Sequence, residues 1–329
     1  MSGDGAALMR HSGARLKAAS PESVNTCLWN MDSGLAATRR PGMTSESGEG
    51  RVRGVAEIAF AVRDGAIRLA HLYQRHPLRV LFPDAAADDV PVAVLVTTSG
   101  GLVAGDRLAI DLRAEPAAAA HVTASAAEKI YRSTGATTEI VQTLSVETGG
   151  WLEYLPPETI LFDGARLRRE TTVALAASAG FLGGGILVFG RRARGEAFSH
   201  GFLHEGWQVH RDGILVWGDR LHLADDNGSD IAAIMTDPAC FDGAAACATL
   251  ILAPANGDPR HYVEAAREVQ QQSAGQELRA GVTAVGGLLV ARWLGFDALA
   301  LRRAYADLAC HLREAAMGLP ARLPRLWHV

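Results

Sequence analysis

The amino-acid sequence predicts a mainly β protein, with many short strands in stacked or helically wound sheets and two α-helices near the C-terminus. Apolar and polar residues alternate along several segments, such as 138–147, which is the pattern of half-buried strands. Turn signals containing Gly or Asp-Gly recur about every 8–12 residues, a spacing typical of all-β proteins. Helical spacing of apolar residues begins only after residue 257. We assign residues 51–329 to a single β-rich domain, because no linker-like segment divides them.

Residues 1–50 differ in composition from the rest of the chain. They are rich in Gly, Ser and Ala and show no sustained apolar period, so we expect a disordered or loosely attached N-terminal extension. They also lack the charged start and apolar run of a secretory signal peptide. The longest apolar stretch of the chain, 180–190, is much shorter than the roughly 20 residues that span a bilayer. We therefore expect a cytoplasmic protein with no membrane partner.

The predicted strands begin with a hairpin. Apolar residues within 55–62 and 67–72 flank Asp64-Gly65, a dipeptide that favours tight turns between antiparallel strands. A short buried strand over 92–96 then leads into a glycine-rich turn at 99–105, and the alternation that follows predicts a half-buried strand over 107–113. Further strands are predicted at 121–125, 138–147, 151–155, 159–162, 168–175, 186–189, 207–210, 214–217 and 221–223.

The glycine-rich turn does not have the sequence of a phosphate-binding loop. The Lys-Ser/Thr pair that completes a Walker loop does not follow Gly100 or Gly101. A dinucleotide-binding loop would open a helix, whose N-terminus holds the pyrophosphate, but a strand pattern follows here. We therefore interpret the glycines as a turn between two strands.

The two predicted helices lie late in the chain. Asp258-Pro259 is a helix-start signal, and apolar residues at helical spacing follow it up to Gly275. An apolar strand is expected over 287–294, and Asp297 then caps the second helix. The apolar stripe of the second helix comprises Leu301, Tyr305, Leu308 and Leu312.

Composition and motifs exclude several functional classes. The chain has 32 basic and 36 acidic residues, so it lacks the basic excess that binds nucleic acid. The sequence contains neither the Gly-x-Ser-x-Gly motif of hydrolases nor the His-Glu-x-x-His motif of metalloproteases. Its four cysteines form no C-x-x-C pair and predict reduced thiols; they are Cys27, Cys240, Cys247 and Cys310. The sequence therefore predicts neither an enzyme nor a tightly bound cofactor.

Five charged residues stand beside or within apolar strand segments. They are Asp106, Glu153, Glu196, Asp219 and Arg220. A buried or half-buried charge persists only where it is paired, hydrated or functional. Ion pairs with neighbouring arginines would explain each residue singly. Together the residues could instead line a polar passage, because carboxylate oxygens are weak ligands that suit a divalent ion in transit.

Five motifs, in their order and spacing, resemble those of one known family. They are GGLVAGD at 100–106, KIYRS at 129–133, LEYLPPETILF at 152–162, the Gly-Arg and Gly-Glu pairs within 190–196, and PRLW at 324–327. Together they resemble the urease accessory protein UreD family, also called UreH, and the likeness covers about 51–329. The resemblance implies a fold of many strands with few, late helices, in agreement with the strand pattern.

The resemblance also implies a function. Family members are not known as enzymes: they bind the urease apoprotein and recruit urease accessory proteins F and G, and this assembly delivers nickel to the urease active site with hydrolysis of GTP. Nickel in transit is then the only metal, and a dimer within the accessory complex is compatible with the family. The resemblance places Asp106, Asp219 and Arg220 at polar positions of an internal passage. The chain departs from the family at Glu128, where small residues often occur, and at Gly184, where some relatives carry an acidic residue.

The sequence leaves two other functions open. A β-rich carbohydrate-active hydrolase or lyase would use paired carboxylates such as Glu153 and Asp163, which would have to lie roughly 5–10 Å apart in an open cleft. A nickel store would use His200, His204 and His210. On a strand, His200 and His204 share a face but stand ~13 Å apart, which favours ordinary surface or structural histidines over one tight metal site.

Overall fold

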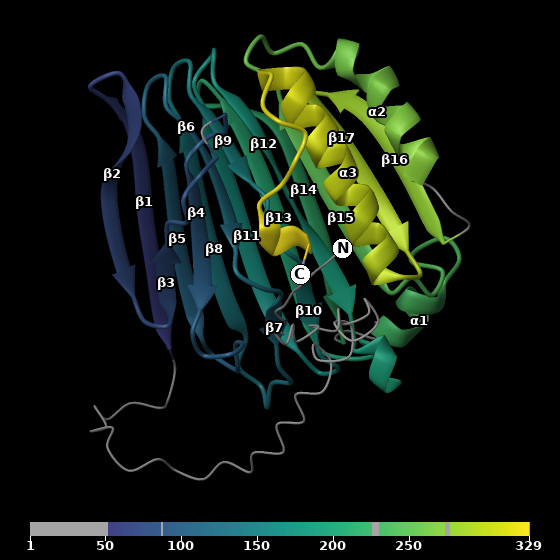
Figure 1. Cartoon of the computed structure of the whole chain (residues 1–329). Helices are drawn as coiled ribbons and strands as arrows, with labels where there is room; N and C mark the ends of the chain where they lie inside the picture. Colours follow the sequence, from purple (N-terminus) through teal and green to yellow (C-terminus); the bar gives the residue numbers. More distant parts are fainter. Residues whose placement is uncertain (1–51, 87, 226–229, 274–276, 329) are drawn as a thin grey trace, which may run out of the picture. The chain divides into compact units, whose positions relative to one another are not determined.

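The computed structural model describes residues 52–86, 88–225, 230–273 and 277–328 of the chain. The extension predicted at 1–50 lies outside these residues. The described part is built on two β-sheets, named A and B below. Its two longer helices pack against one face of sheet B (Figure 1).

Sheet A contains seven of the described strands. These are β1 (Arg53–Arg63), β2 (Ala66–Arg75), β5 (Arg107–Ala114), β8 (Thr138–Val146), β11 (Arg166–Leu175), β13 (Phe202–Arg211) and β14 (Ile214–Ala224). Their order across the sheet is β14-β13-β11-β8-β5-β1-β2. The five central strands are parallel, whereas β2 and β14 pair antiparallel at the two edges.

Sheet B contains ten of the described strands. These are β3 (Leu78–Leu81), β4 (Val92–Thr97), β6 (Ala119–Ala124), β7 (Glu128–Ile130), β9 (Trp151–Tyr154), β10 (Thr159–Leu161), β12 (Gly180–Phe189), β15 (Ala246–Ala253), β16 (Leu278–Val285) and β17 (Leu288–Gly295). The main order is β16-β17-β15-β12-β9-β6-β4-β3, and β10 pairs with both β12 and β7.

The chain winds helically between the two sheets. From β4 to β13 it passes back and forth between sheet B and sheet A, and the strands pair in parallel in the orders β4-β6-β9-β12 and β5-β8-β11-β13. Parallel neighbours cannot be joined by a tight hairpin. Here most of the crossovers run through the opposite sheet instead of through a helix. The structure thus confirms a mainly β fold with stacked, wound sheets.

Alternation along the strands divides the buried side chains between two hydrophobic cores. On β12, Phe181 and Leu187 belong to the core between the sheets, whereas Leu182 and Ile186 belong to the core between sheet B and the helices. A strand buried on both faces is apolar at nearly every position. This explains the uninterrupted apolar stretch at 180–190.

Both predicted helices are present, as α2 (Arg260–Ser273) and α3 (Ala298–Met317). The Asp297 side chain accepts a hydrogen bond from the backbone N–H of Leu299 at 2.9 Å, which confirms the predicted cap of α3. The short helix α1 (Ile231–Thr236) and strand β16 were not predicted. Helix α1 has six residues, too few for a helical period, and β16 buries only Leu278 and Val282. None of the described helices has both the length and the apolar character needed to cross a membrane.

The predicted turns follow from the backbone conformations of their residues. Asp64-Gly65 and Asp212-Gly213 both have positive φ angles at both positions, as the favoured two-residue hairpin turns require. They close the antiparallel pairs β1–β2 and β13–β14. The glycine-rich turn at 99–105 also connects two strands, as predicted, but it carries the chain from β4 in sheet B to β5 in sheet A.

Candidate functional site

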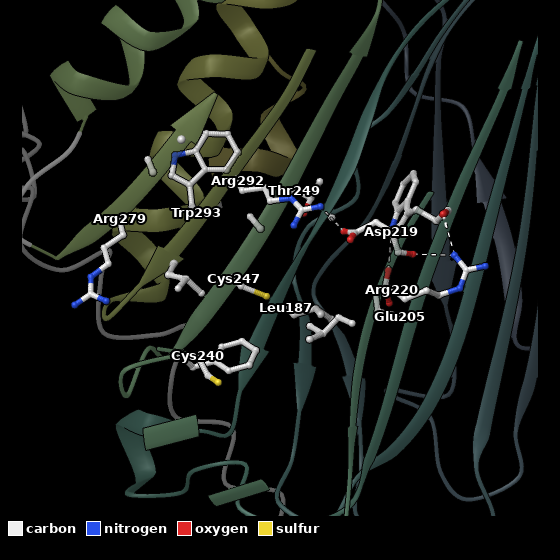
Figure 2. A pocket seen from close by; sticks show the side chains of 18 of the residues that line it. Leu187, Glu205, Asp219, Arg220, Cys240, Cys247, Thr249, Arg279, Arg292 and Trp293 are labelled. Carbon is white, nitrogen blue, oxygen red and sulfur yellow. Dashed lines mark hydrogen bonds and ion pairs between the residues drawn. The ribbon is translucent and has the colours of Figure 1, made fainter. Parts of the chain in front are cut away.

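A cavity of about 470 Å³ lies between sheets A and B, where β13 and β14 face β12, β15, β16 and β17 (Figure 2). Both of its walls carry charge. Sheet A contributes Arg169, Glu205 and Asp219, and sheet B contributes Arg279 and Arg292. Charged groups between two sheets persist only if they are paired, hydrated or functional. We therefore take this cavity as the candidate functional site.

The wall from sheet A consists of two neighbouring rows of side chains. In the first row, strand pairing places side by side Asp219, Trp207, Thr171 and Gln142. In the second row, Arg169 and Glu205 are paired across β11 and β13. Residues two apart on a strand share a face. The alternation that buries Val173 and Val209 in the core therefore also turns Arg169 and Glu205 inward.

The wall from sheet B also consists of two rows, and its glycines create the space. One row contains Gly281, Arg292, Thr249 and Gly185, and the next contains Arg279, Leu294, Cys247, Leu187, Thr159 and Glu128. A Cβ atom added at Gly281 would meet no atom within 4 Å, and one at Gly185 would meet only Arg169 Nη2 at 3.8 Å. Larger residues at these two positions would project into the cavity.

A buried ion pair closes the inner end of the cavity. Arg169 Nε donates to both carboxylate oxygens of Glu205, at 3.0 and 2.7 Å, and each residue is 8% exposed. Trp207 Nε1 donates to Glu205 at 3.0 Å, and Arg169 Nη1 donates to Thr159 Oγ1 at 2.8 Å. Burial opposes the charge of Arg169, but the charge of Glu205 and its hydrogen bonds outweigh burial and raise the pKa of Arg169.

A second, more exposed ion pair lies at the opposite side of the cavity. Arg292 Nη2 is 2.9 Å from Asp219 Oδ2, and the two side chains are 54% and 29% exposed. Arg220 follows Asp219 on β14 and points to the other face of sheet A, where its guanidinium lies 3.9 Å from the Glu170 carboxylate. It donates a hydrogen bond to the backbone oxygen of Trp207. Asp219 is therefore the member of this sequence pair that faces the cavity.

Polar groups continue beyond Arg169. Thr171 Oγ1 donates to Gln142 at 2.8 Å, and Gln142 Nε2 donates to the Tyr154 hydroxyl at 2.7 Å. Between these groups and Arg169 the space narrows to a void of about 10 Å³. Burial raises the pKa of Tyr154 to about 12, so its hydroxyl stays protonated at neutral pH.

Glu128 lies next in this direction. It is paired with Thr159 across β7 and β10, and Thr97 Oγ1 donates to its carboxylate at 2.5 Å. Burial raises the pKa of Glu128, although the hydrogen bond from Thr97 and the charge of Arg169 oppose this rise. A file of polar groups thus runs between the sheets from Asp219 through the Arg169–Glu205 pair to Glu128.

The potential metal ligands of the cavity are weak. Burial raises the pKa of the Cys247 thiol to about 12, so the thiolate needed for metal binding is scarce at neutral pH. Within the described ranges, no three His, Cys, Asp or Glu side chains are grouped so that they could hold a metal ion. The carboxylates of Glu205 and Asp219 therefore remain as weak oxygen ligands.

Comparison with known proteins identifies the family. The model of the family described as "UreD urease accessory protein" matches residues 52–328. The chain belongs to the UreD family. Three similar proteins are all named urease accessory protein UreD. The protein from Magnetococcus marinus is 44% identical over 282 residues, which cover 84% of this chain and 94% of that protein.

The other two relatives also match this chain over most of their length. The protein from Granulibacter bethesdensis is 40% identical over 249 residues, covering 75% of this chain and 99% of that protein. The protein from Rhodopseudomonas palustris (strain BisA53) is 38% identical over 277 residues, which cover 84% of this chain and 91% of that protein. These matches confirm the resemblance to UreD drawn from the sequence motifs and assign an accessory role in urease maturation to the family.

Asp106, which the resemblance to UreD places in an internal passage, lies in the glycine-rich turn and not at the cavity. Its side chain is 1% exposed and accepts hydrogen bonds from the backbone N–H groups of Val52 and Val103, both at 2.9 Å. These bonds join the turn to the segment that enters β1. These contacts show that Asp106 fixes the backbone of the turn. Its role in an ion passage stays a prediction.

Glu153, which was predicted from its place in an apolar strand, faces the helices instead of the space between the sheets. Its fully buried carboxylate is 2.7 Å from His121 Nδ1 and accepts hydrogen bonds from Arg313 Nε at 3.1 and 3.2 Å. Burial disfavours its charge, but His121 and Arg313 outweigh burial and lower the pKa of Glu153. Arg313 belongs to α3, so the network ties this helix to sheet B.

Glu196, which was predicted as one of the charged residues beside apolar segments, stabilises the loop before β13. It pairs with Arg191 and accepts a hydrogen bond from the backbone N–H of Asp163 at 3.2 Å. The hydrogen bond from Arg191 lowers the pKa of Glu196 although partial burial opposes the charge. Of the five predicted residues, only Asp219 faces the cavity with its side chain. Arg220 borders the cavity but turns its guanidinium to the other face of sheet A, and the other three residues lie elsewhere.

The residues of the two alternative functions lack the arrangements that those functions need. Glu153 is sealed from solvent, so Glu153 and Asp163 cannot flank a substrate in an open cleft. His200 lies 3.1 Å from Asp163, and His204 lies 2.8 Å from Glu170. Two of the three histidines of the alternative nickel store, His200 and His204, are therefore paired with separate carboxylates.

Arg169, Glu205 and Glu128 were not among the site residues predicted from the sequence. Arg169 has the same parity as Thr171 and Val173 in the predicted strand over 168–175, so the alternation alone places it inward. Glu205 stands two residues before Trp207 on β13, so it lies on the same inward face of the strand. A charged residue at an inward position of an otherwise apolar face was the available signal.

Proposed function

We propose that this UreD chain is a non-catalytic scaffold of urease maturation that binds the urease apoprotein and recruits accessory proteins F and G. In that complex it lets nickel pass through the charged space between its sheets, while GTP hydrolysis by G drives the delivery. The observation that best supports the passage is the file of polar groups from Asp219 to Glu128 between the two sheets.

The chemistry of the cavity suits transfer better than storage. An ion in transit must be released, so its ligands must be weak and few. Glu205 and Asp219 offer carboxylate oxygens, and Cys247 is held as a protonated thiol that competes poorly for metal. Each carboxylate is already paired with an arginine, which weakens its hold on a passing cation further.

The proposal is tested in a urease-producing cell that lacks the gene for this chain. We expect urease to assemble as an apoprotein with little nickel, and nickel content to return when the wild-type chain is supplied. We also expect the tagged chain to co-purify with urease subunits and with accessory protein F. Full nickel loading of urease in the deletion strain, or a tagged chain that captures neither partner, would refute the proposal.

A further inference from the structure

The Arg169–Glu205 ion pair stands between the cavity and the inner polar groups. We propose that Arg169 is a gate that selects divalent over monovalent cations, because only a divalent cation displaces its guanidinium from Glu205. The displaced guanidinium then pairs with Glu128. This inference rests on the proposed function, since it assigns the selectivity of the same passage to one residue.

The gate is closed in this structure. Arg169 Nε holds both oxygens of the Glu205 carboxylate, and Glu205 is fixed further by Trp207 Nε1. The cavity of about 470 Å³ includes Arg169 and Glu205 in its lining, whereas the void beyond Arg169 measures only about 10 Å³. In this proposal an ion beside Asp219 reaches Glu128 between the sheets when the Arg169 side chain moves aside.

A second carboxylate, that of Glu128, lies near the guanidinium of Arg169. Arg169 Nη1 donates to Thr159 Oγ1, and Thr159 is the direct neighbour of Glu128 in the β7–β10 pairing. The charge of Arg169 favours the ionised form of Glu128 even in the closed arrangement. Glu128 thus offers a half-buried carboxylate to Arg169 on the side away from the cavity, and Thr97 Oγ1 donates to one of its oxygens at 2.5 Å.

Charge decides which cations open the gate. A monovalent cation carries the same charge as Arg169 but cannot supply its two directional hydrogen bonds, so it gains nothing by replacing the guanidinium. A divalent cation doubles the Coulomb attraction to Glu205. Asp219 lies on the neighbouring strand, diagonal to Glu205 on the same face of sheet A. Its carboxylate can therefore bind the incoming ion together with that of Glu205.

The first test measures nickel binding to the purified full-length chain by equilibrium dialysis in sodium or potassium chloride. Arg169→Met removes the guanidinium from Glu205, so we expect nickel to bind about tenfold more tightly or better, and high monovalent salt to compete more strongly than in the wild type. Arg168→Met changes the adjacent residue, which is exposed on the opposite face of β11, and should leave both properties unchanged.

A second pair of variants covers the event that Arg169→Met fails to fold around an unpaired Glu205. Arg169→Lys keeps the charge but loses the forked hydrogen bonds, so we expect nickel binding to tighten about two- to threefold. The double variant Arg169→Met/Glu205→Gln contains no buried charge at the pair and should lose this binding. Unchanged nickel affinity in Arg169→Lys, or full binding by the double variant, overturns the gate. Neither result depends on urease, so loss of the scaffold function is recognised separately by co-purification.

Discussion

The Glu153 carboxylate shows how a single residue can join distant parts of the chain. His121 from β6, Trp151 from β9 and Arg313 from α3 all contact it, and it has no exposed surface. A charge in such a place is stable only while its partners remain. The importance of Glu153 for stability is therefore expected to exceed that of any solvent-exposed carboxylate on the strands.

Glu153→Gln is expected to lower the free energy of unfolding by about 3 kcal/mol at neutral pH, because it removes one of the two carboxylates that pair with the buried Arg313 and leaves only Asp89. The native pKa of Glu153 is lowered, so its stabilisation is complete above the unfolded value of about 4.3 and is lost as pH falls through the native value. Urea unfolding at a series of pH values should show the difference from wild type shrinking below about pH 4. Glu147→Gln, at an exposed position, is the control, and a difference independent of pH would contradict this account.

The thiols at the cavity should differ in reactivity. Burial raises the pKa of Cys247 to about 12, whereas Cys240 is exposed. Since the thiolate is the reactive form, iodoacetamide at pH 8 should modify Cys240 much faster than Cys247 in the native chain. Peptide mass spectrometry over time measures both rates. Equal rates without denaturant would show that Cys247 is not enclosed as described.

At the scale of single residues, the sequence predicted which positions were chemically unusual better than it predicted where they lie. It singled out Glu153 and Asp219, and both are buried or half-buried charges with arginine partners. It could not show that Glu153 faces the helices and Asp219 the cavity. That distinction depends on which face of each strand meets which layer, and the layers form only by pairing of strands distant in sequence.

At the scale of elements, helix α3 combines a local signal with distant contacts. Asp297 starts it and Gly318 ends it in a left-handed conformation, both of which are visible in the sequence. Its packing depends on buried groups such as Tyr305 and Leu308 against sheet B. The Arg313 guanidinium then bonds to Asp89 and Glu153 on two other segments.

Asp297→Ala should remove the cap of α3 and lower the free energy of unfolding by about 1 kcal/mol, because the N–H of Leu299 loses its acceptor. Asp307→Ala, at an exposed position within the same helix, serves as the control and should cost nothing. Thermal unfolding by circular dichroism compares the two. Equal melting temperatures for both variants would mean that the cap contributes little.

Elements with strong local patterns were predictable, and elements defined by their partners were not. The hairpins at Asp64-Gly65 and Asp212-Gly213 and both longer helices follow from turn and cap signals. Strand β16 is held by its pairing with β17 and exposes most of its residues, so its sequence carries little alternation. The Arg169–Glu205 pair joins residues 36 positions apart on adjacent parallel strands, a relation that no local pattern reveals.

At the scale of the whole molecule, the chain winds between two sheets, and polar side chains from several strands can line up in the space between them. Neighbouring rows of side chains line up across several strands, so one inward polar position on each strand gives a continuous file. Gly185 and Gly281 keep part of that interior open. In our account this opening is where nickel enters or leaves the passage.

Gly281→Leu places a large side chain into the cavity from β16. Because the added Cβ meets no atom within 4 Å, we expect the fold and its stability to be retained. Gly218→Leu is the matched control: it makes the same change at an exposed position of β14, on the face of sheet A away from the cavity. Both variants should co-purify with urease subunits as the wild type does.

The nickel content of urease purified from cells that carry each variant in place of the wild-type chain measures the passage itself. The account predicts wild-type nickel loading with Gly218→Leu and a severalfold lower loading with Gly281→Leu. Equal loading of urease by the two variants, with Gly281→Leu still bound to its partners, would contradict a route for nickel through this cavity.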